Sequence, residues 1–168
     1  MNSHKLLPPL VCGFGAAVLN TIPGVKSIGC CLVVPVAAWF SLILNEKINK
    51  VQPPVPLQDA FFFGFLAGLF AAIFSTGFDV LITLIMHTND FVQTLPQTET
   101  VLKGWNIGEL WKETSSLLHK MSSDIQTKGF SLLYTLASLF SNVIIDSIFG
   151  MVGGLIGMHI QNKRKNVQ

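Results

Sequence analysis

The chain has 168 residues, half of them apolar and only 12% charged, and its 11 Lys and Arg against 9 Asp and Glu leave a formal net charge of +2. This composition is too apolar for an ordinary soluble domain, and the basic run at residues 163–165 is too short for nucleic-acid binding. The sequence contains no P-loop, serine-hydrolase elbow or zinc-protease motif, and its four histidines are isolated from one another. We therefore expect a protein that is not an enzyme and that has no cofactor, no metal and no nucleic-acid partner.

Four long segments without charge indicate helices that cross a membrane. Each has about 17 to 20 uncharged residues, close to the roughly 20 that an α-helix needs to span the hydrocarbon core. A soluble bundle is the alternative, but it would need polar outer faces that these segments lack. We predict an all-α integral membrane four-helix bundle whose spans cover residues 6–22, 28–44, 60–86 and 130–160.

The first two predicted spans form a helical hairpin. Pro23 and Gly24, followed by Lys26, predict a tight turn with almost no linker outside the membrane. Pro35 lies inside the second span and predicts a kink there, which serves either as a fixed packing feature or as a hinge. The first span is interpreted as retained rather than as a cleaved secretory signal, because no small-residue cleavage pattern follows it.

Small residues recur at helical spacing in the third and fourth spans. Gly64 and Gly68 form a G-x-x-x-G step, and the fourth span carries two further steps, Gly150 with Gly154 and Gly153 with Gly157. Lipid tails are as apolar as leucine, so close van der Waals packing between small residues replaces the hydrophobic drive for helix association. We predict that these glycines pack the two spans backbone to backbone. The alternative is that one of their faces supports a homodimer or a larger membrane complex.

Two aspartates, Asp79 and Asp146, interrupt the third and fourth spans. A charged Asp at the bilayer centre costs about 2.5–3.5 kcal/mol, so a retained intramembrane carboxylate is a candidate functional residue. Asn142 lies one helical turn before Asp146 and extends a polar stripe on the same face. We take Asp79, Asp146 and Asn142 as a candidate ion or proton site. The simpler alternative is that the stripe only faces the third span.

The segment between the third and fourth spans is too long for a passive connection. Its second half, residues 105–128, has apolar side chains at intervals of three and four and predicts an amphipathic helix outside the membrane. Trp105 and Trp111 suit the headgroup layer and are predicted interface anchors. The helix is expected to lie on the outer leaflet or to cap the bundle, and docking on a partner protein is the alternative.

The distribution of positive charge predicts the orientation. Lys and Arg next to helix ends collect on the side that holds both termini, including the closing run Lys163, Arg164 and Lys165. Because such residues stay on the cytoplasmic side, both termini are predicted to be cytoplasmic, with the lipid bilayer of the cell membrane as the principal partner.

The placement of glycines also carries a resemblance. It rests on residues 13–17, 22–24, 29–32 and 64–69, followed by a long outer segment and a glycine-rich last span. In this arrangement the chain resembles small uncharacterised bacterial four-span membrane proteins, which are classed as domains of unknown function. The resemblance covers most of the chain; it implies a multi-pass protein of the bacterial inner membrane with unassigned activity, and it supplies no catalytic residues.

Two functions remain as expectations. The first is a non-enzymatic membrane scaffold or accessory subunit, whose glycine faces and outer amphipathic segment contact partners. The second is a small transporter coupled to protons or cations, which would use Asp146 with Asp79.

Overall fold

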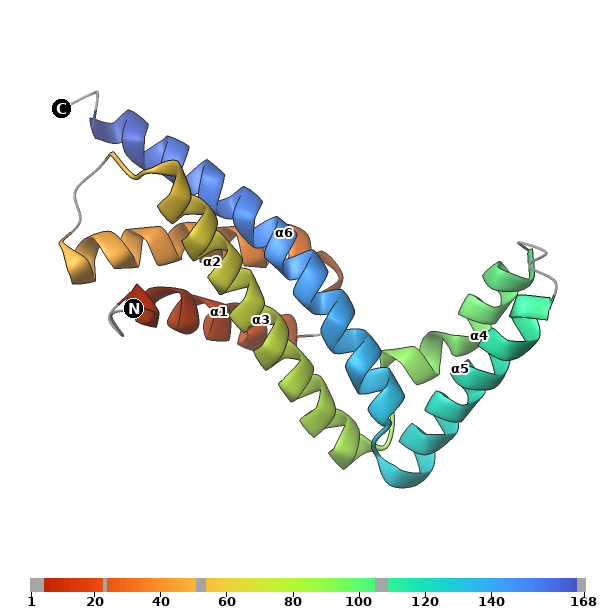
Figure 1. Cartoon of the computed structure of the whole chain (residues 1–168). Coiled ribbons are helices and arrows are strands. Elements are labelled where there is room, and N and C mark those ends of the chain that lie inside the picture. The colour runs from red at the N-terminus through yellow and green to blue at the C-terminus, as the bar shows by residue number, and fades with distance from the viewer. Residues whose placement is uncertain (1–4, 23, 51–53, 105–108, 166–168) are drawn as a thin grey trace. The chain divides into compact units, whose positions relative to one another are not determined.

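The computed structural model describes residues 5–22, 24–50, 54–104 and 109–165, and the secondary structure in these ranges is entirely α-helical (Figure 1). The helices are α1 (Leu7–Asn20), α2 (Lys26–Asn49), α3 (Leu57–Met86), α4 (Asp90–Gly104), α5 (Glu109–Lys128) and α6 (Leu132–Lys165). The predicted all-α class is confirmed.

The chain forms two compact units. Unit 1 comprises Met1–Phe78 and Leu139–Gln168, and unit 2 comprises Asp79–Ser138. Unit 1 therefore contains α1, α2 and the larger parts of α3 and α6. Unit 2 contains α4, α5 and the adjoining ends of α3 and α6.

Three helices are long and apolar enough to cross a membrane. These segments are Ile28–Asn49 in α2, Leu57–Met86 in α3 and Leu132–Arg164 in α6, and they correspond to the second, third and fourth predicted spans. The first predicted span corresponds to α1, which is apolar but has only 14 residues. At ~1.5 Å per residue it extends about 21 Å, less than the ~30 Å of a hydrocarbon core. Three of the four predicted spans are therefore helices long enough to cross a membrane, and the first is a shorter apolar helix.

The end of α1 explains why this helix is short. The amide of Thr21 bonds to the carbonyl of Val18 at 3.2 Å, and its hydroxyl donates to the same carbonyl at 2.7 Å. Ile22 precedes a proline, and a residue in that position disfavours the helical conformation. Gly24 then adopts a φ of +89°, which lets the chain turn directly into α2.

The helices of unit 1 alternate in direction. α1 and α2 pack against each other across their short connection. On the other side of α2, Pro35 and Trp39 lie against Gly153 and Gly157 of α6. Because the numbering rises together along both helices, α2 and α6 run in the same direction. The α2–α3 connection is held to α6 by Asn162, which accepts from the Val55 amide at 2.8 Å and donates to the Val55 carbonyl at 3.2 Å.

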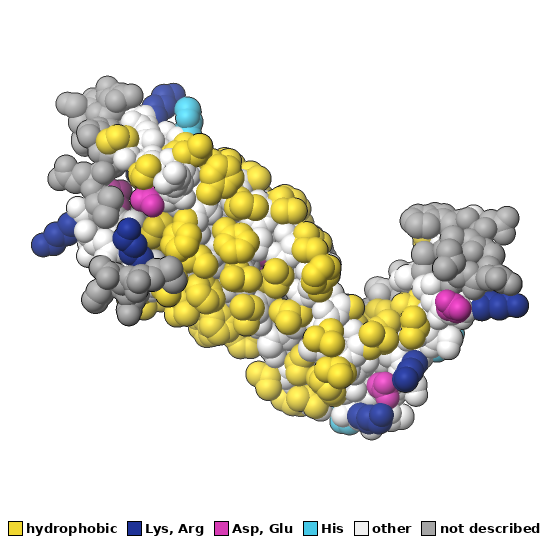
Figure 2. All heavy atoms as spheres, viewed as in Figure 1, with side chains coloured by type: hydrophobic (Ala, Val, Ile, Leu, Met, Phe, Trp, Pro, Cys, Tyr) yellow, Lys and Arg dark blue, Asp and Glu magenta, His cyan; other side chains and the backbone are white. Residues whose placement is uncertain are grey.

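Unit 1 has mostly small side chains inside, with Val34, Leu42 and Phe63 as larger exceptions, and many large apolar side chains outside. Its buried apolar residues are mostly alanines, namely Ala16, Ala17, Ala37, Ala38, Ala60, Ala67, Ala71 and Ala72. Aromatic and aliphatic side chains cover much of the surface seen in Figure 2, and charged groups gather at the end of the unit where α6 ends. Phe40, for example, is 53% exposed and Leu32 is 57% exposed. A bundle in water buries its largest apolar side chains, so this reversed distribution favours a surface that contacts lipid.

Unit 2 contains a helix that the sequence did not predict. The predicted amphipathic helix at 105–128 corresponds to α5, with residues 105–108 outside the described ranges, and α4 packs against it. Leu95 of α4 and Ile125 of α5 are buried, and His119 Nε2 lies 2.8 Å from Glu99 Oε1. The two helices therefore support each other.

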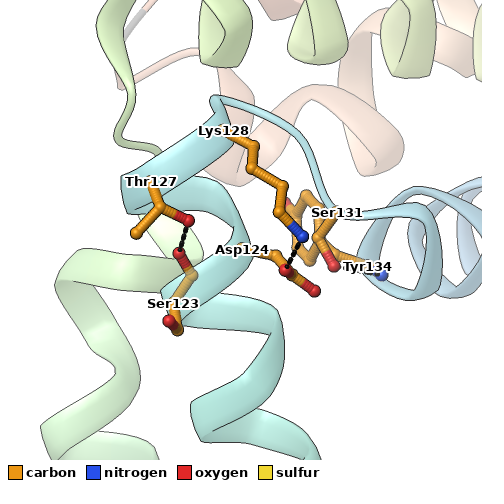
Figure 3. Close-up of polar contacts among 6 residues, drawn as sticks. All are labelled: Ser123, Asp124, Thr127, Lys128, Ser131 and Tyr134. Atoms are coloured by element: carbon orange, nitrogen blue, oxygen red, sulfur yellow. Dashed lines mark hydrogen bonds and ion pairs between the residues drawn. The ribbon is translucent and has the colours of Figure 1, made fainter.

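Polar contacts shape the turn from α5 into α6 (Figure 3). Along the last turns of α5, Lys128 Nζ pairs with Asp124 Oδ1 at 2.7 Å and the Thr127 hydroxyl donates to the Ser123 carbonyl at 2.7 Å. Gly129 follows with a φ of +68°, a conformation that ends helices and that suits glycine. The helix α6 then begins with the Tyr134 amide donating to the side chain of Ser131 at 3.4 Å.

Candidate functional site

Asp146 lies in the interior of unit 1, where its residue is only 6% exposed. The helices approach closely here, because a Cβ on Gly68 of α3 would meet the Asp146 carbonyl oxygen and would lie 2.9 Å from the Cα of Ser147. The carboxylate-bearing turn of α6 therefore has α3 against its main chain.

Asn142 joins α6 to α3 by a side-chain hydrogen bond. Its Nδ2 donates to the Thr76 hydroxyl oxygen at 3.1 Å, and Thr76 is buried with 5% exposure. The predicted polar stripe on α6 thus faces α3 at this position. An interhelical hydrogen bond of this kind typically contributes about 0.6 kcal/mol inside a membrane, so it orients the helices more than it holds them together.

Asp79, the third residue of the candidate ion site, lies in unit 2. Its carbonyl accepts a hydrogen bond of 2.6 Å from the Thr83 hydroxyl, which satisfies a polar group within α3. Asp146 and Asn142 belong to unit 1. The pairing of the two carboxylates stays a prediction.

The glycines of α3 and α6 meet main chain to main chain. A Cβ on Gly64 would meet the carbonyl oxygen of Gly150, and a Cβ on Gly150 would meet the carbonyl oxygen of Gly64. One turn further along α6, a Cβ on Gly154 would meet the carbonyl oxygen of Ala60. The order of these contacts shows that α3 and α6 run in opposite directions in unit 1. Neither helix has room for a side chain at these positions.

The second glycine step of α6 faces a different helix. Gly153 lies against the main chain of Pro35, and a Cβ on Gly157 would lie 2.7 Å from Cδ1 of Trp39 and 3.1 Å from its Cα. The two steps of α6 therefore hold α3 on one side and α2 on the other. α6 thus packs against both α2 and α3, and on the other side of the unit Gly13 of α1 lies against Ala67 and Ala71 of α3.

Trp111, one of the two predicted interface anchors, is partly buried near the beginning of α5. Trp105, the other anchor, lies outside the described residues. The role of both as membrane-interface residues stays a prediction.

A groove between α1 and α2 was not predicted. It has a volume of about 390 Å³, and Gly15, Leu19, Leu32, Val36 and Phe40 are among the residues that line it. The residues that line the groove are apolar or small, like most residues of the predicted spans, so nothing in the sequence distinguishes them.

Neither metal chemistry nor known relatives point to a function. Within the described ranges, no group of three or more His, Cys, Asp or Glu side chains is placed to hold a metal ion. No family model, curated protein or solved structure matches the chain. Function therefore has to be inferred from the contacts described above.

Proposed function

We propose that the chain is a multi-pass membrane protein in which α1, α2, α3 and α6 cross the bilayer and the α4–α5 pair lies outside it. Support comes from the small side chains inside unit 1 and the large apolar ones on its surface. Packing between small residues is how helices associate where the solvent is itself apolar. The short α1 crosses as one arm of a hairpin with α2, and the bilayer adapts to its length by thinning locally.

In this proposal both termini are cytoplasmic and the α4–α5 pair faces the opposite side of the cell membrane. Four crossings place the beginning of α1 and the end of α6 on one side, in agreement with the alternating helix directions of unit 1. That side carries Lys47, Lys163 and Arg164, which favours the cytoplasm.

The proposed role is a non-enzymatic scaffold or accessory subunit. The observation that carries it is the main-chain contact of α3 with α6 at Gly64 and Gly150, continued at Gly68 by the carbonyl of Asp146. Contacts without intervening side chains leave little freedom for one helix to slide along the other. Such a pair suits a rigid support, from which the amphipathic α4–α5 pair presents its outer surface to a partner.

A proton- or cation-coupled transporter is the second candidate, and one observation favours it. Asp146 is buried in the apolar part of unit 1, beside the polar pair of Asn142 and Thr76. Retaining a carboxylate in such a place is costly and is common where a protein moves protons or cations. In this candidate Asp146 acts together with Asp79.

Substitution of Asp146 separates the two candidates. Wild-type protein, Asp146→Asn and a control, Asp124→Asn in exposed α5, are reconstituted in liposomes that hold a pH-sensitive dye. A scaffold gives the same proton or cation flux as empty liposomes in all three cases, and Asp146→Asn leaves its stability unchanged or raises it. Flux that appears with the wild type and the Asp124 variant, but is lost with Asp146→Asn, contradicts the scaffold and supports the transporter.

Cysteine labelling tests the four crossings. In a variant whose native cysteines are replaced by serine, a single cysteine at position 163 or at position 126 is exposed to an impermeant maleimide from one side at a time. The proposed topology places Lys163→Cys and Gln126→Cys on opposite sides of the membrane. Labelling of both from the same side would contradict the single crossing that the proposal assigns to α6 between these two positions.

A further inference from the structure

Two neighbouring cysteines of α2 have their sulfur atoms in contact. Cys30 Sγ and Cys31 Sγ are 3.5 Å apart, and both cysteines are free thiols. Successive residues of an α-helix point about 100° apart around its axis, so helical geometry alone does not bring two such side chains together. Cys31 is exposed on the helix surface and Cys30 is partly buried. The pair is therefore an accessible dithiol held on a rigid element.

The sulfur separation decides which kind of atom the pair can bind. A metal cation with linear two-coordinate geometry needs one sulfur atom on each side of it, farther apart than the sulfur atoms of Cys30 and Cys31 lie. A tetrahedral zinc site needs four ligands, and the described residues offer no third Cys, His, Asp or Glu in a suitable group. A trivalent atom with pyramidal geometry fits the pair better, because the two sulfur atoms occupy two of its three positions and an oxygen or carbon ligand occupies the third.

The apolar surroundings of the pair narrow the choice of ligand further. Ile28 and Leu32, the exposed residues on either side of the pair in α2, are both apolar. A ligand that adds charge is costly where the dielectric constant is low. The favoured ligand is therefore one that binds two thiols without any change in charge.

We propose that Cys30 and Cys31 form a dithiol site that captures trivalent arsenic or antimony. For arsenic the reaction is As(OH)₃ + 2 RSH → (RS)₂AsOH + 2 H₂O. Two arsenic–oxygen bonds break, two arsenic–sulfur bonds form, and the thiol protons leave in the two waters. Every species is neutral, the oxidation state of arsenic does not change, and no oxidant is needed. This inference does not depend on the scaffold or transporter role.

Phenylarsine oxide is the probe for this site, because it has two exchangeable positions on a trivalent arsenic. The full chain in lipid nanodiscs is treated with the probe, washed with an excess of a monothiol, and measured by intact mass. The comparison covers the wild type, Cys30→Ser, Cys31→Ser and a control, Cys12→Ser. The control removes the remaining cysteine, which lies in α1. Helicity and elution volume establish that each variant is folded.

Chelation predicts a clear pattern. Because the second bond forms intramolecularly, the dithiol adduct resists the monothiol roughly 10²- to 10⁴-fold better than a single-thiol adduct. The wild type and Cys12→Ser keep one probe per chain, with the mass of the probe less one water, and release it to a dithiol competitor. Cys30→Ser and Cys31→Ser lose the probe in the monothiol wash.

Either of two results with phenylarsine oxide overturns the proposal. One is retention of the probe by Cys30→Ser or Cys31→Ser at the wild-type level. The other is loss of the probe from wild-type protein during the monothiol wash, which would mean that the two sulfurs do not chelate. A final arm with sodium arsenite, measured by its protection of both cysteines from a maleimide, extends the result to the inorganic ligand. Failure of arsenite to protect them would restrict the site to organic arsenicals and contradict the proposal as stated.

Discussion

Replacing Gly68 by alanine tests the close contact between α3 and α6. The new Cβ would meet the Asp146 carbonyl oxygen and would lie 2.6 Å from the carbonyl carbon and 2.9 Å from the Cα of Ser147. All of these are main-chain atoms, so no side chain can rotate away and α6 itself has to move. Overpacking of this kind costs about 1–3 kcal/mol. The unfolding equilibrium constant should therefore rise by roughly 5- to 150-fold.

Gly77→Ala is the matched control, because it makes the same substitution in the same helix. No atom lies within 4 Å of a Cβ at Gly77. Alanine is the better helix former by about 0.8–1.0 kcal/mol in water, so Gly77→Ala should be neutral or stabilising. Both variants are unfolded by titrating a denaturing detergent into mild micelles while helicity is followed by circular dichroism. Equal midpoints for the two variants, or a lower midpoint for Gly77→Ala, would refute the proposed backbone contact.

Three further substitutions probe other contacts by the same unfolding titration. Thr76→Val removes the acceptor of the Asn142 hydrogen bond and should cost about 0.6 kcal/mol, with a maximum of about 1.7; a double-mutant cycle with Asn142→Leu that shows no coupling would contradict the bond. Asn162→Ala removes both hydrogen bonds to Val55 and should cost about 1–3 kcal/mol. It should also speed proteolysis in the α2–α3 connection, and an unchanged cleavage rate would argue against the clamp. Gly129→Ala forces an L-residue to a φ of +68° and should cost about 1–2 kcal/mol, whereas a neutral result would mean that the turn adopts another conformation.

Sequence patterns predicted the long helices well and missed one element. The third span was predicted at 60–86 and α3 is Leu57–Met86, because a long uncharged run has few alternatives to a helix. α4 was missed since Pro96 lies inside it and its residues are mostly polar. A local signal was nevertheless present: the Asn89 side chain accepts from the Val92 amide at 3.0 Å, and Asp90 follows in the first turn.

The glycine spacing did not reveal that Gly153 and Gly157 contact α2 rather than α3. Gly150 and Gly153 are three residues apart, so their directions around α6 differ by about 60°. That difference is enough to turn one step towards α3 and the other towards α2, and spacing within one helix cannot reveal its partner. The sulfur contact of Cys30 with Cys31 was missed for a similar reason, because it depends on side-chain rotation rather than on position in the chain.

The partners of α6 have a consequence for biosynthesis. Its polar contacts join Thr76 to Asn142, 66 positions apart, and Val55 to Asn162, 107 positions apart. The ribosome therefore completes α2 and α3 well before the helix that contacts both of them is made, and Gly64 and Gly68 lack their α6 contacts in the meantime. A nascent chain stalled at that stage would expose the glycine surface of α3 to other helices with small side chains. The interval before α6 is synthesised is therefore the period of greatest risk for misassembly.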